Sequence, residues 1–327
     1  MDFRLTEDQE ALRSGIRDFC DGRVGVDQLR ELEGEACVDA GLWSELAEMG
    51  VFSLRQPESS GGVGLGMADA VVVFAELGRR LVPGPLVWTH LAAGVVDGAG
   101  AGEAVVGGID ATGGASEPWL VEHLDRLDAL LVLRDDGVWR LDPKQLAAKS
   151  AGLPLDPHTP LHLLESLPRG ERIGDAAAAQ ELRLEGAALV AAQMLGISEA
   201  TLELANDYAK RREQFGRAIG SFQSIKHILA DMFVRQQVAR AAVYAAGATL
   251  DDPVVGDVAR AVASAKIVAG GAALENARAC IQIHGGMGYT WEIPAHYYLK
   301  RAWVCENLFG SVEEHADHVA ADLDRRL

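Results

Sequence analysis

The chain has 327 residues and a formal net charge of −18, with 48 acidic and 30 basic side chains. This charge argues against nucleic acid or an anionic membrane as the main partner, because both are negatively charged. The four cysteines are far apart and show no C-x-x-C spacing, which predicts neither a disulfide framework nor a zinc site and favours the reducing cytoplasm. No apolar run of the roughly 18 residues needed to cross a bilayer is evident and no signal peptide opens the chain, so we expect no membrane span.

The first hundred residues follow helical periodicity. Thr6 with Gln9 three positions later predicts a capping box. Four apolar residues then share one helical face: Leu12, Ile16, Phe19 and Cys20. Gly50 is the predicted C-cap of a second helix. The glycine-rich segment 57–66 follows a helix rather than a strand, so we interpret it as a turn and not as a dinucleotide loop. We expect an N-terminal helical domain over residues 1–102.

Short strand-like runs replace this pattern between residues 103 and 175. Runs at 104–109, 129–133 and 138–141 are apolar and bounded by turn residues. Asp136-Gly137 predicts a hairpin between the last two. We expect a reduced β domain over residues 103–175.

From residue 176 onward the chain is helical again and rich in alanine. Four residues at positions i, i+4, i+7 and i+8 predict a helix buried along one side: Ile225, Leu229, Met232 and Phe233. Loops at 215–221 and 284–294 separate the helices. We expect four long helices in an antiparallel bundle over residues 176–327, and a fold that is mainly α with a small central β domain.

The segment from Tyr208 to Gln223 places a basic helix end, an aromatic ring and an amide close together. In one interpretation Phe215 belongs to the core and Gly216 caps the helix. In the other, Arg212 binds a phosphate, Phe215 stacks on an adenine and Gln223 makes a polar contact. The residues alone leave both open and favour the first.

Three glycines follow a predicted helix end in the segment 282–289. In one interpretation the glycines form a C-cap and a turn. In the other they allow a ligand to approach the backbone closely. His284 has no second ligand at metal spacing, so we expect a loop or interface residue rather than a metal ligand or a base. No metal site is predicted.

Four segments, at 3–9, 46–64, 208–223 and 282–294, resemble in this order the acyl-CoA dehydrogenase family. The resemblance implies a helical domain, a β domain and a four-helix domain that surround FAD and an acyl-CoA thioester. In that family a glutamate removes the α-proton while the β-hydrogen leaves as hydride to the flavin.

The family's catalytic base has no counterpart in this chain. Where the family reads Tyr-Glu-Gly-Thr, this sequence reads Leu308-Phe309-Gly310-Ser311, and a phenyl ring cannot accept a proton. Some members carry the glutamate on the first C-terminal helix, where Gly186 stands here. Glu185, one residue away, is rotated by about 100° on a helix. No catalytic residue is therefore assigned, and a displaced base at Glu185 or Glu306 is the alternative.

A second departure concerns the β domain, which lacks the Thr-Glu-Pro-x-x-Gly-Ser-Asp and Trp-x-x-Asn segments that line the flavin ring in the family. The residues that the family uses across a subunit interface, toward the adenosine end of FAD, are present. By this resemblance the cofactor-binding residues are Arg212, Gln214, Phe215, Gln223, Gln282, Gly285 and Gly286.

The resemblance therefore predicts one subunit of a heteromeric FAD-dependent acyl-CoA dehydrogenase, active only with a second subunit that carries the catalytic Glu. We expect a two-plus-two heterotetramer in the cytoplasm, with FAD shared at the interface and a bulky, steroid-type acyl-CoA substrate. Two alternatives stay open: a self-sufficient homomeric dehydrogenase with a displaced base, and a non-enzymatic acyl-CoA-binding or scaffold protein.

Overall fold

The computed structural model describes residues 4–33, 37–114 and 117–324. The chain divides into two compact units. Residues 1–26, 71–82 and 187–327 form one, here called the bundle unit, and residues 27–70 and 83–186 form the other, the sheet unit. The three predicted segments 1–102, 103–175 and 176–327 remain a proposal about domain organisation.

The N-terminal part of the chain is helical, as predicted. The Thr6 hydroxyl accepts a hydrogen bond from the Gln9 N–H, and Gln9 Oε1 accepts one from the Thr6 N–H, which confirms the capping box. Gly50 follows the end of the third helix with a φ of 77°, as a left-handed C-cap requires. The helices are α1 (Glu7–Arg23), α2 (Val26–Glu31), α3 (Ala40–Glu48), α4 (Met67–Arg79) and α5 (Leu86–Ala92).

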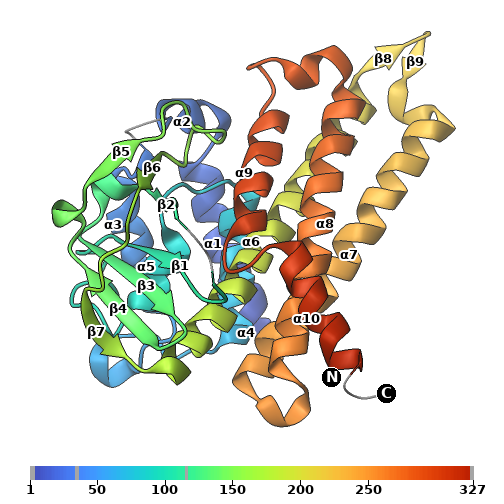
Figure 1. Cartoon of the computed structure of the whole chain (residues 1–327). Helices are drawn as coiled ribbons and strands as arrows, with labels where there is room; N and C mark the ends of the chain where they lie inside the picture. Colours follow the sequence, from blue (N-terminus) through green and yellow to red (C-terminus); the bar gives the residue numbers. More distant parts are fainter. Residues whose placement is uncertain (1–3, 34–36, 115–116, 325–327) are drawn as a thin grey trace. The chain divides into compact units, whose positions relative to one another are not determined.

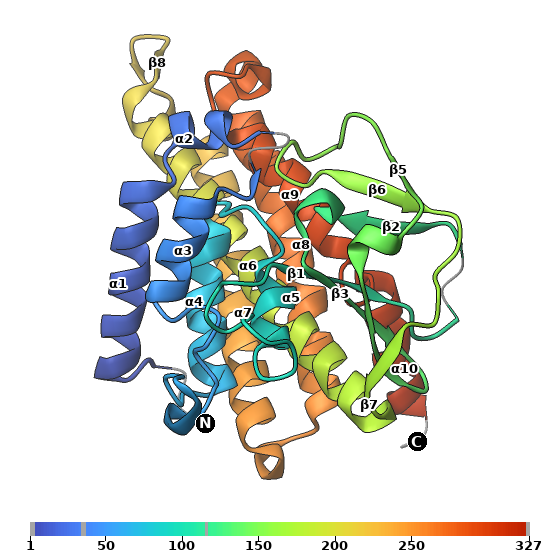
Figure 2. The same ribbon diagram turned by 90° about the vertical axis from the view of Figure 1, so that its left-hand side faces the viewer.

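Two small sheets make up the β module of the sheet unit, which confirms a small β region (Figures 1 and 2). One has the order β1-β3-β4-β7, with β1 parallel to β3, and the other has the order β2-β6-β5. The strands are β1 (Val106–Asp110), β2 (Trp119–Glu122), β3 (Ala129–Arg134), β4 (Gly137–Leu141), β5 (Ala148–Ser150), β6 (Leu161–Leu164) and β7 (Glu171–Gly174).

Helix α5 packs directly on β1. A Cβ at Gly108 would lie 2.3 Å from the Trp88 ring, so only glycine leaves room for this contact. The Thr89 hydroxyl bonds both the N–H and the carbonyl of Val106 at 3.0 Å. These two hydrogen bonds satisfy the backbone N–H and carbonyl of Val106 and fix β1 against α5.

The hairpin between β3 and β4 forms, but its turn lies one residue earlier than predicted. Arg134 pairs with Gly137, so the turn residues are Asp135 and Asp136. Gly137 already belongs to β4, with a φ of 150°. Its backbone packs against the Gly174 carbonyl, where a Cβ would lie only 2.4 Å away, and this contact explains the glycine.

Long helices dominate the C-terminal part of the chain, and α7, α8 and α9 lie side by side in the bundle unit (Figure 1). The expected fourth long helix is instead two helices of 13 residues each, α9 and α10. The elements are α6 (Ala176–Arg211), α7 (Gln223–Asp251), α8 (Val258–His284), α9 (Ala295–Asn307) and α10 (Val312–Asp324).

One predicted core position on α7 is wrong. Met232 is fully buried, whereas Phe233 is 52% exposed. Neighbouring residues on a helix point about 100° apart, and on α7 the buried side takes the methionine rather than the phenylalanine.

Glycines allow α4 and α6 to approach closely within the bundle unit. A Cβ at Gly78 would lie 2.2 Å from the Gln193 carbonyl oxygen, and one at Gly196 would lie 1.9 Å from that of Ala75. Each distance is too short for any side chain. The two helices therefore touch through their backbones.

Helix α6 is long and apolar enough to cross a membrane by composition, contrary to the expectation of no such run. The residues of its apolar window are 83% buried, as in the core helix of a folded protein. The four cysteines are buried, and none forms a disulfide bond with a described residue.

Candidate functional site

Phe215 stands at the tip of a hairpin between β8 (Glu213–Gln214) and β9 (Arg217–Ala218). Phe215 and Gly216 form its two-residue turn, with φ values of 55° and 76°. Positive φ at both positions defines a type I′ turn, a conformation that a bulky residue rarely adopts. The Phe215 ring is 91% exposed. The interpretation of Phe215 as a core residue and Gly216 as a helix cap is therefore wrong.

Two arginines flank this hairpin and differ in their surroundings. The Arg212 N–H donates to the Tyr208 carbonyl at 2.8 Å, which continues the path of α6 by one residue. Its exposed guanidinium makes no hydrogen bond or ion pair with the described residues. The Arg217 guanidinium lies 4.0 Å from the centre of the Phe222 ring and is held by a cation–π contact. Arg212 is thus available to an anion, and Arg217 supports the hairpin.

The glycine turn begins at His284, the last residue of α8. Of the two predicted places for His284, a loop or an interface, the loop is wrong: the ring is buried at the end of α8 and stacks on Tyr208 of α6 at a centroid distance of 4.2 Å. Its Nδ1 lies 2.8 Å from the Cys280 carbonyl, so Nδ1 carries the proton and donates to that oxygen. Burial lowers the pKa of His284, and the Cys280 hydrogen bond only partly opposes this effect. The neutral ring therefore packs the end of α8 against α6.

The hairpin and the loop after α8 lie at the same end of the bundle in both views (Figures 1 and 2). An apolar cluster holds them there, built from α6, α7, α8 and α9. Its buried members are Ala205, Ala209, Met232, Cys280, Ile281, Ile283 and Ala295. Tertiary packing thus brings together two segments about 70 residues apart in the chain.

The predicted cofactor-binding residues form an exposed face at this end. Gln214, Gln223 and Gln282 are exposed. Positions for a Cβ at Gly285 and Gly286 have no heavy atom within 4 Å, so their backbone is open to a ligand. A free guanidinium, an exposed phenyl ring and an open glycine backbone suit a diphosphate joined to an adenine. The chemistry of this face fits the adenosine half of FAD.

The turn after α9 contains the position that the resemblance assigns to the catalytic base. Phe309 occupies it with a φ of 54° and is 2% exposed. His315 Nε2 donates to the Phe309 carbonyl at 2.9 Å. Lys266 of α8 is fully buried, and its ammonium lies 2.6 to 3.2 Å from four carbonyl oxygens, those of Cys305, Glu306, Leu308 and Gly310. The ammonium thus binds the Glu306 carbonyl at the C-terminus of α9 and two carbonyls of the turn, while the Cys305 carbonyl also accepts a hydrogen bond from the Leu308 N–H. The backbone of the turn is therefore held without a carboxylate at position 309.

The alternative base, Glu185, is already engaged. It is 6% exposed, and both of its carboxylate oxygens accept hydrogen bonds from the Arg55 guanidinium, one of them at 2.7 Å. This is a bidentate pair within the sheet unit. Glu306 accepts a hydrogen bond from the Val312 N–H at 3.3 Å.

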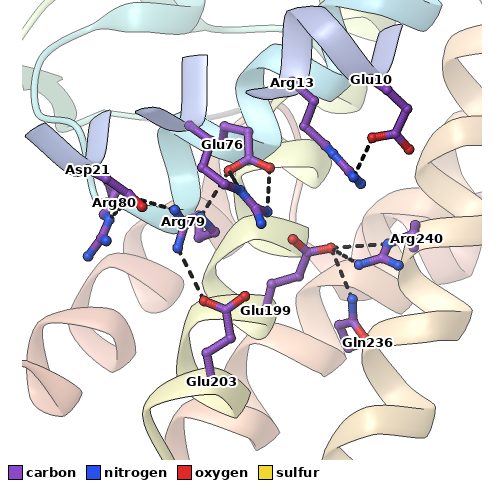
Figure 3. A network of polar contacts seen from close by, with 11 residues as sticks. Glu10, Arg13, Asp21, Glu76, Arg79, Arg80, Glu199, Glu203, Gln236 and Arg240 are labelled. Carbon is purple, nitrogen blue, oxygen red and sulfur yellow. Dashed lines mark hydrogen bonds and ion pairs between the residues drawn. The ribbon is translucent and has the colours of Figure 1, made fainter. Parts of the chain in front are cut away.

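A network of charged side chains, built around the buried Glu76, Arg79 and Glu199, crosses the bundle unit (Figure 3). Arg17 of α1 donates two hydrogen bonds to Glu76 of α4, at 2.9 and 2.7 Å. Arg79 donates to Glu76 at 2.9 Å and to Glu203 of α6 at 3.2 Å, and it also pairs with Asp21. The hydrogen bond to Glu76 is the largest influence on the pKa of Arg17, which is raised.

A second part of the network joins α6 to α7. Glu199 is 8% exposed and accepts hydrogen bonds from Arg240 at 2.6 Å and from Gln236 at 3.0 Å. Figure 3 shows these side chains beside those of the Glu76 cluster. Arginines and carboxylates thus compensate each other's charge between helices, and we assign the network a structural role.

Sequence reasoning missed Lys266, Arg55 and the Glu76 network. Charged residues on helices are usually exposed, so periodicity alone does not mark a buried one. Glu76 and Arg79 do interrupt an apolar stretch of α4, and this interruption was a signal in the sequence.

Comparison with known proteins agrees with this architecture. Residues 6–103 match the N-terminal domain of acyl-CoA dehydrogenases, and residues 176–323 match their C-terminal domain. These matches place the chain among flavin-dependent oxidoreductases. More narrowly, the chain belongs to the acyl-CoA dehydrogenase family, whose cofactor is FAD.

Two curated relatives come from Mycobacterium tuberculosis (strain ATCC 25618 / H37Rv). The chain is 33% identical over 320 residues to acyl-CoA dehydrogenase IpdE2, covering 94% of this chain and 95% of IpdE2. It is 33% identical over 333 residues to acyl-CoA dehydrogenase FadE34, covering 91% of this chain. The chain spans only 45% of the length of FadE34.

Solved structures confirm the fold class. The ChsE4-ChsE5 complex from Mycobacterium tuberculosis matches with a TM-score of 0.85 and 24% identity, over 99% of both chains. The Tcur3481-Tcur3483 steroid ACAD G363A variant matches with a TM-score of 0.85 and 22% identity, over 98% of both chains. The mainly α fold with a small central β module is thus that of acyl-CoA dehydrogenases.

Proposed function

We propose that this chain is the non-catalytic subunit of a heteromeric acyl-CoA dehydrogenase and is active only with a second subunit that carries the catalytic glutamate. The complex desaturates an acyl-CoA thioester between Cα and Cβ. When bound, FAD supplies the acceptor for the hydride that leaves Cβ. This chain contributes residues to the adenosine side of FAD, and the partner's glutamate takes the α-proton.

The observation that carries the proposal is the turn at Phe309. Lys266 and His315 hold its backbone in a left-handed conformation, although a bulky residue rarely adopts one. The phenyl ring is buried and carries no atom that can accept a proton. Loss of a general base costs on the order of 10²–10⁴ in rate, so this turn does not support proton abstraction.

The surroundings of Glu185 do not support its role as a displaced catalytic base. A general base needs an oxygen within hydrogen-bond reach of the substrate proton. Both Glu185 oxygens already bond to Arg55. Breaking this buried bidentate pair would leave a charged group without its partner, at a cost of about 3–5 kcal/mol.

We assign only the adenosine side of the FAD site to this chain, which supports the need for a partner. The residues fitted to the adenosine half of FAD lie on the surface of the bundle unit, while the family motifs for the flavin ring are absent from residues 103–175. Large exposed apolar side chains are typical of surfaces that another protein covers. In the bundle unit they include Phe215, Phe233, Val234, Val238, Tyr289 and Trp291, each at least 52% exposed.

The solved relatives support the kind of partner and substrate. ChsE4-ChsE5 is a complex of two different proteins, and Tcur3481-Tcur3483 is described as a steroid ACAD. We infer a two-plus-two heterotetramer with FAD shared at the interface and a steroid-type CoA thioester as substrate. Cytoplasmic localisation belongs to the same proposal, since four cysteines without a disulfide bond to any described residue suit a reducing compartment.

Purification of the chain alone and with its partner tests the proposal. The visible absorbance of flavin should be low for the chain alone and should reach one FAD per heterodimer after mixing with a subunit that has a complete β domain. Dehydrogenase activity should appear only in the mixture. A flavin-loaded, active homo-oligomer would support the homomeric alternative. A chain that binds acyl-CoA but neither FAD nor a partner would support the scaffold alternative.

A further inference from the structure

A cavity of about 410 Å³ lies between the end of α6, the β8–β9 hairpin and the start of α7, all in the bundle unit. Its volume falls within the roughly 300–1,000 Å³ that is typical of small-molecule sites. The lining consists of Asn206, Ala209, Lys210, Ala218, Gly220, Lys226 and Leu229. Nothing in the proposed function uses this cavity.

The charge around the cavity is opposite to that of the whole chain. Residues 210–226 contain five basic side chains and one acidic side chain, in a protein with a net charge of −18. Lys210 and Lys226 are exposed and line the cavity. Neither ammonium group forms a hydrogen bond or an ion pair with the described residues. Two uncompensated ammonium groups at one cavity attract an anion.

The other lining residues indicate which chemical groups of the ligand can lie beside its anionic group. Ala209, Ala218 and Leu229 offer an apolar wall, and Asn206 offers an amide that can donate or accept hydrogen bonds. A phosphate monoester carries between one and two negative charges at neutral pH and matches two ammonium groups, whereas a carboxylate neutralises only one. We propose that this cavity binds a phosphate-bearing small molecule, with the phosphate on Lys210 and Lys226 and its organic part on the apolar wall.

Lys210 and Lys226 differ in their position relative to the adenosine-binding face. Tyr208 points to His284, with the ring centroids 4.2 Å apart. Lys210 is two residues further along α6 and is rotated by about 200° from Tyr208. Arg212 is four residues further and returns to within about 40° of Tyr208. Lys210 thus projects away from that face, whereas Lys226 lies three residues after Gln223 and shares its side of α7, so the Arg212→Ala variant decides whether the two sites are separate.

Calorimetric titration of the full chain with AMP tests this inference, with adenosine and inorganic phosphate as comparison ligands. AMP should bind with one-to-one stoichiometry at the cavity, inorganic phosphate more weakly, and adenosine not at all. Lys210→Met and Lys226→Met should each weaken AMP binding about tenfold, as expected for a hydrogen bond to a charged group. Higher salt should weaken binding further.

Three further variants locate the site. Ala218→Phe keeps both lysines but fills the cavity, so it should also reduce AMP binding. Lys144→Met removes an exposed charge in the sheet unit and should have no effect. Arg212→Ala should leave AMP binding at the cavity intact, which separates this inference from the proposed function.

Absence of AMP and phosphate binding to the wild-type chain would overturn the inference. So would AMP binding that survives the double variant K210M/K226M, because the phosphate would then lie elsewhere. Loss of AMP binding in Arg212→Ala would show that AMP occupies the adenosine-binding face instead. The melting temperature of each variant confirms that the exposed substitutions leave the fold unchanged.

Discussion

Glu76→Gln tests whether the buried Glu76 carboxylate, drawn with its partners in Figure 3, stabilises the bundle unit. Glu76 is 1% exposed and accepts three hydrogen bonds, two from Arg17 and one from Arg79. Glutamine has nearly the same shape but no charge. Its amide nitrogen can only donate, so it would face guanidinium N–H groups that also donate.

The expected loss of stability follows from the exposure of the two partners. Removing one member of a buried ion pair costs about 3–5 kcal/mol. The Arg17 side chain is 34% exposed and can turn to water, and Arg79 keeps its contacts with Glu203 and Asp21. Both effects favour the lower limit, about 3 kcal/mol. For a unit of 150–250 residues this corresponds to a fall in melting temperature of roughly 6–12 °C.

Differential scanning calorimetry measures this fall, with Glu10→Gln as the matched control. Glu10 pairs with Arg13 on the same helix, and their side chains are 48% and 30% exposed. An exposed pair of this kind contributes about 0.3–0.5 kcal/mol, so the control should change the melting temperature by less than about 2 °C. If Glu76→Gln destabilises the chain no more than the control does, the network does not stabilise the fold through its charges.

Three further predictions follow from the site and the network. Arg212→Ala should weaken FAD retention by the complex about ten- to a hundredfold without lowering the melting temperature of the chain alone. The control Arg278→Ala, at an exposed pair with Glu275, should retain FAD. Equal FAD retention by both variants would show that Arg212 is only a charge at the end of a helix. Phe309→Glu should lower stability and add no activity, because burial disfavours the carboxylate and the flavin-ring motifs are absent; a doubled turnover per heterodimer would contradict this. Burial opposes ionisation of Asp21, but its hydrogen bond with Arg80 and the charges of Arg79 and Arg80 outweigh this and lower its pKa. The folded pKa thus lies below the ordinary value of 3.8, so this stabilisation is present above about pH 3.8 and is lost as the pH falls through the folded pKa. Melting curves of Asp21→Asn should lack this acid-dependent loss, and a curve parallel to the wild type would refute it.

Local signals in the sequence predicted the elements that depend on neighbours in the chain. The capping box at Thr6 and Gln9, the cap at Gly50 and the strand runs are decided within a few residues, and the structure contains them. The turn between β3 and β4 was displaced by one residue, because pairing with β7 and packing at Gly137 also influence the register.

Residues with two acceptable local environments could not be assigned in this way. Phe233 continues an apolar pattern but points outward, because Met232 takes the core position beside it. Phe215 could have packed inside as a helix-end aromatic, but a type I′ turn projects it into solvent. Periodicity describes a direction around a helix and does not tell which neighbour is present there.

The sequence by itself determined the family, the order of helical and β segments, and the absence of a carboxylate at position 309, because each depends on residue identity and spacing. Only the tertiary structure decided what surrounds those residues. It paired Glu185 with Arg55, placed the ammonium of Lys266 among four carbonyls of the Phe309 turn, and brought the hairpin and the glycine turn to one end of the bundle. The physical reason is that burial, charge pairing and hydrogen bonding join residues distant in the chain, and these partners exist only after the helices pack.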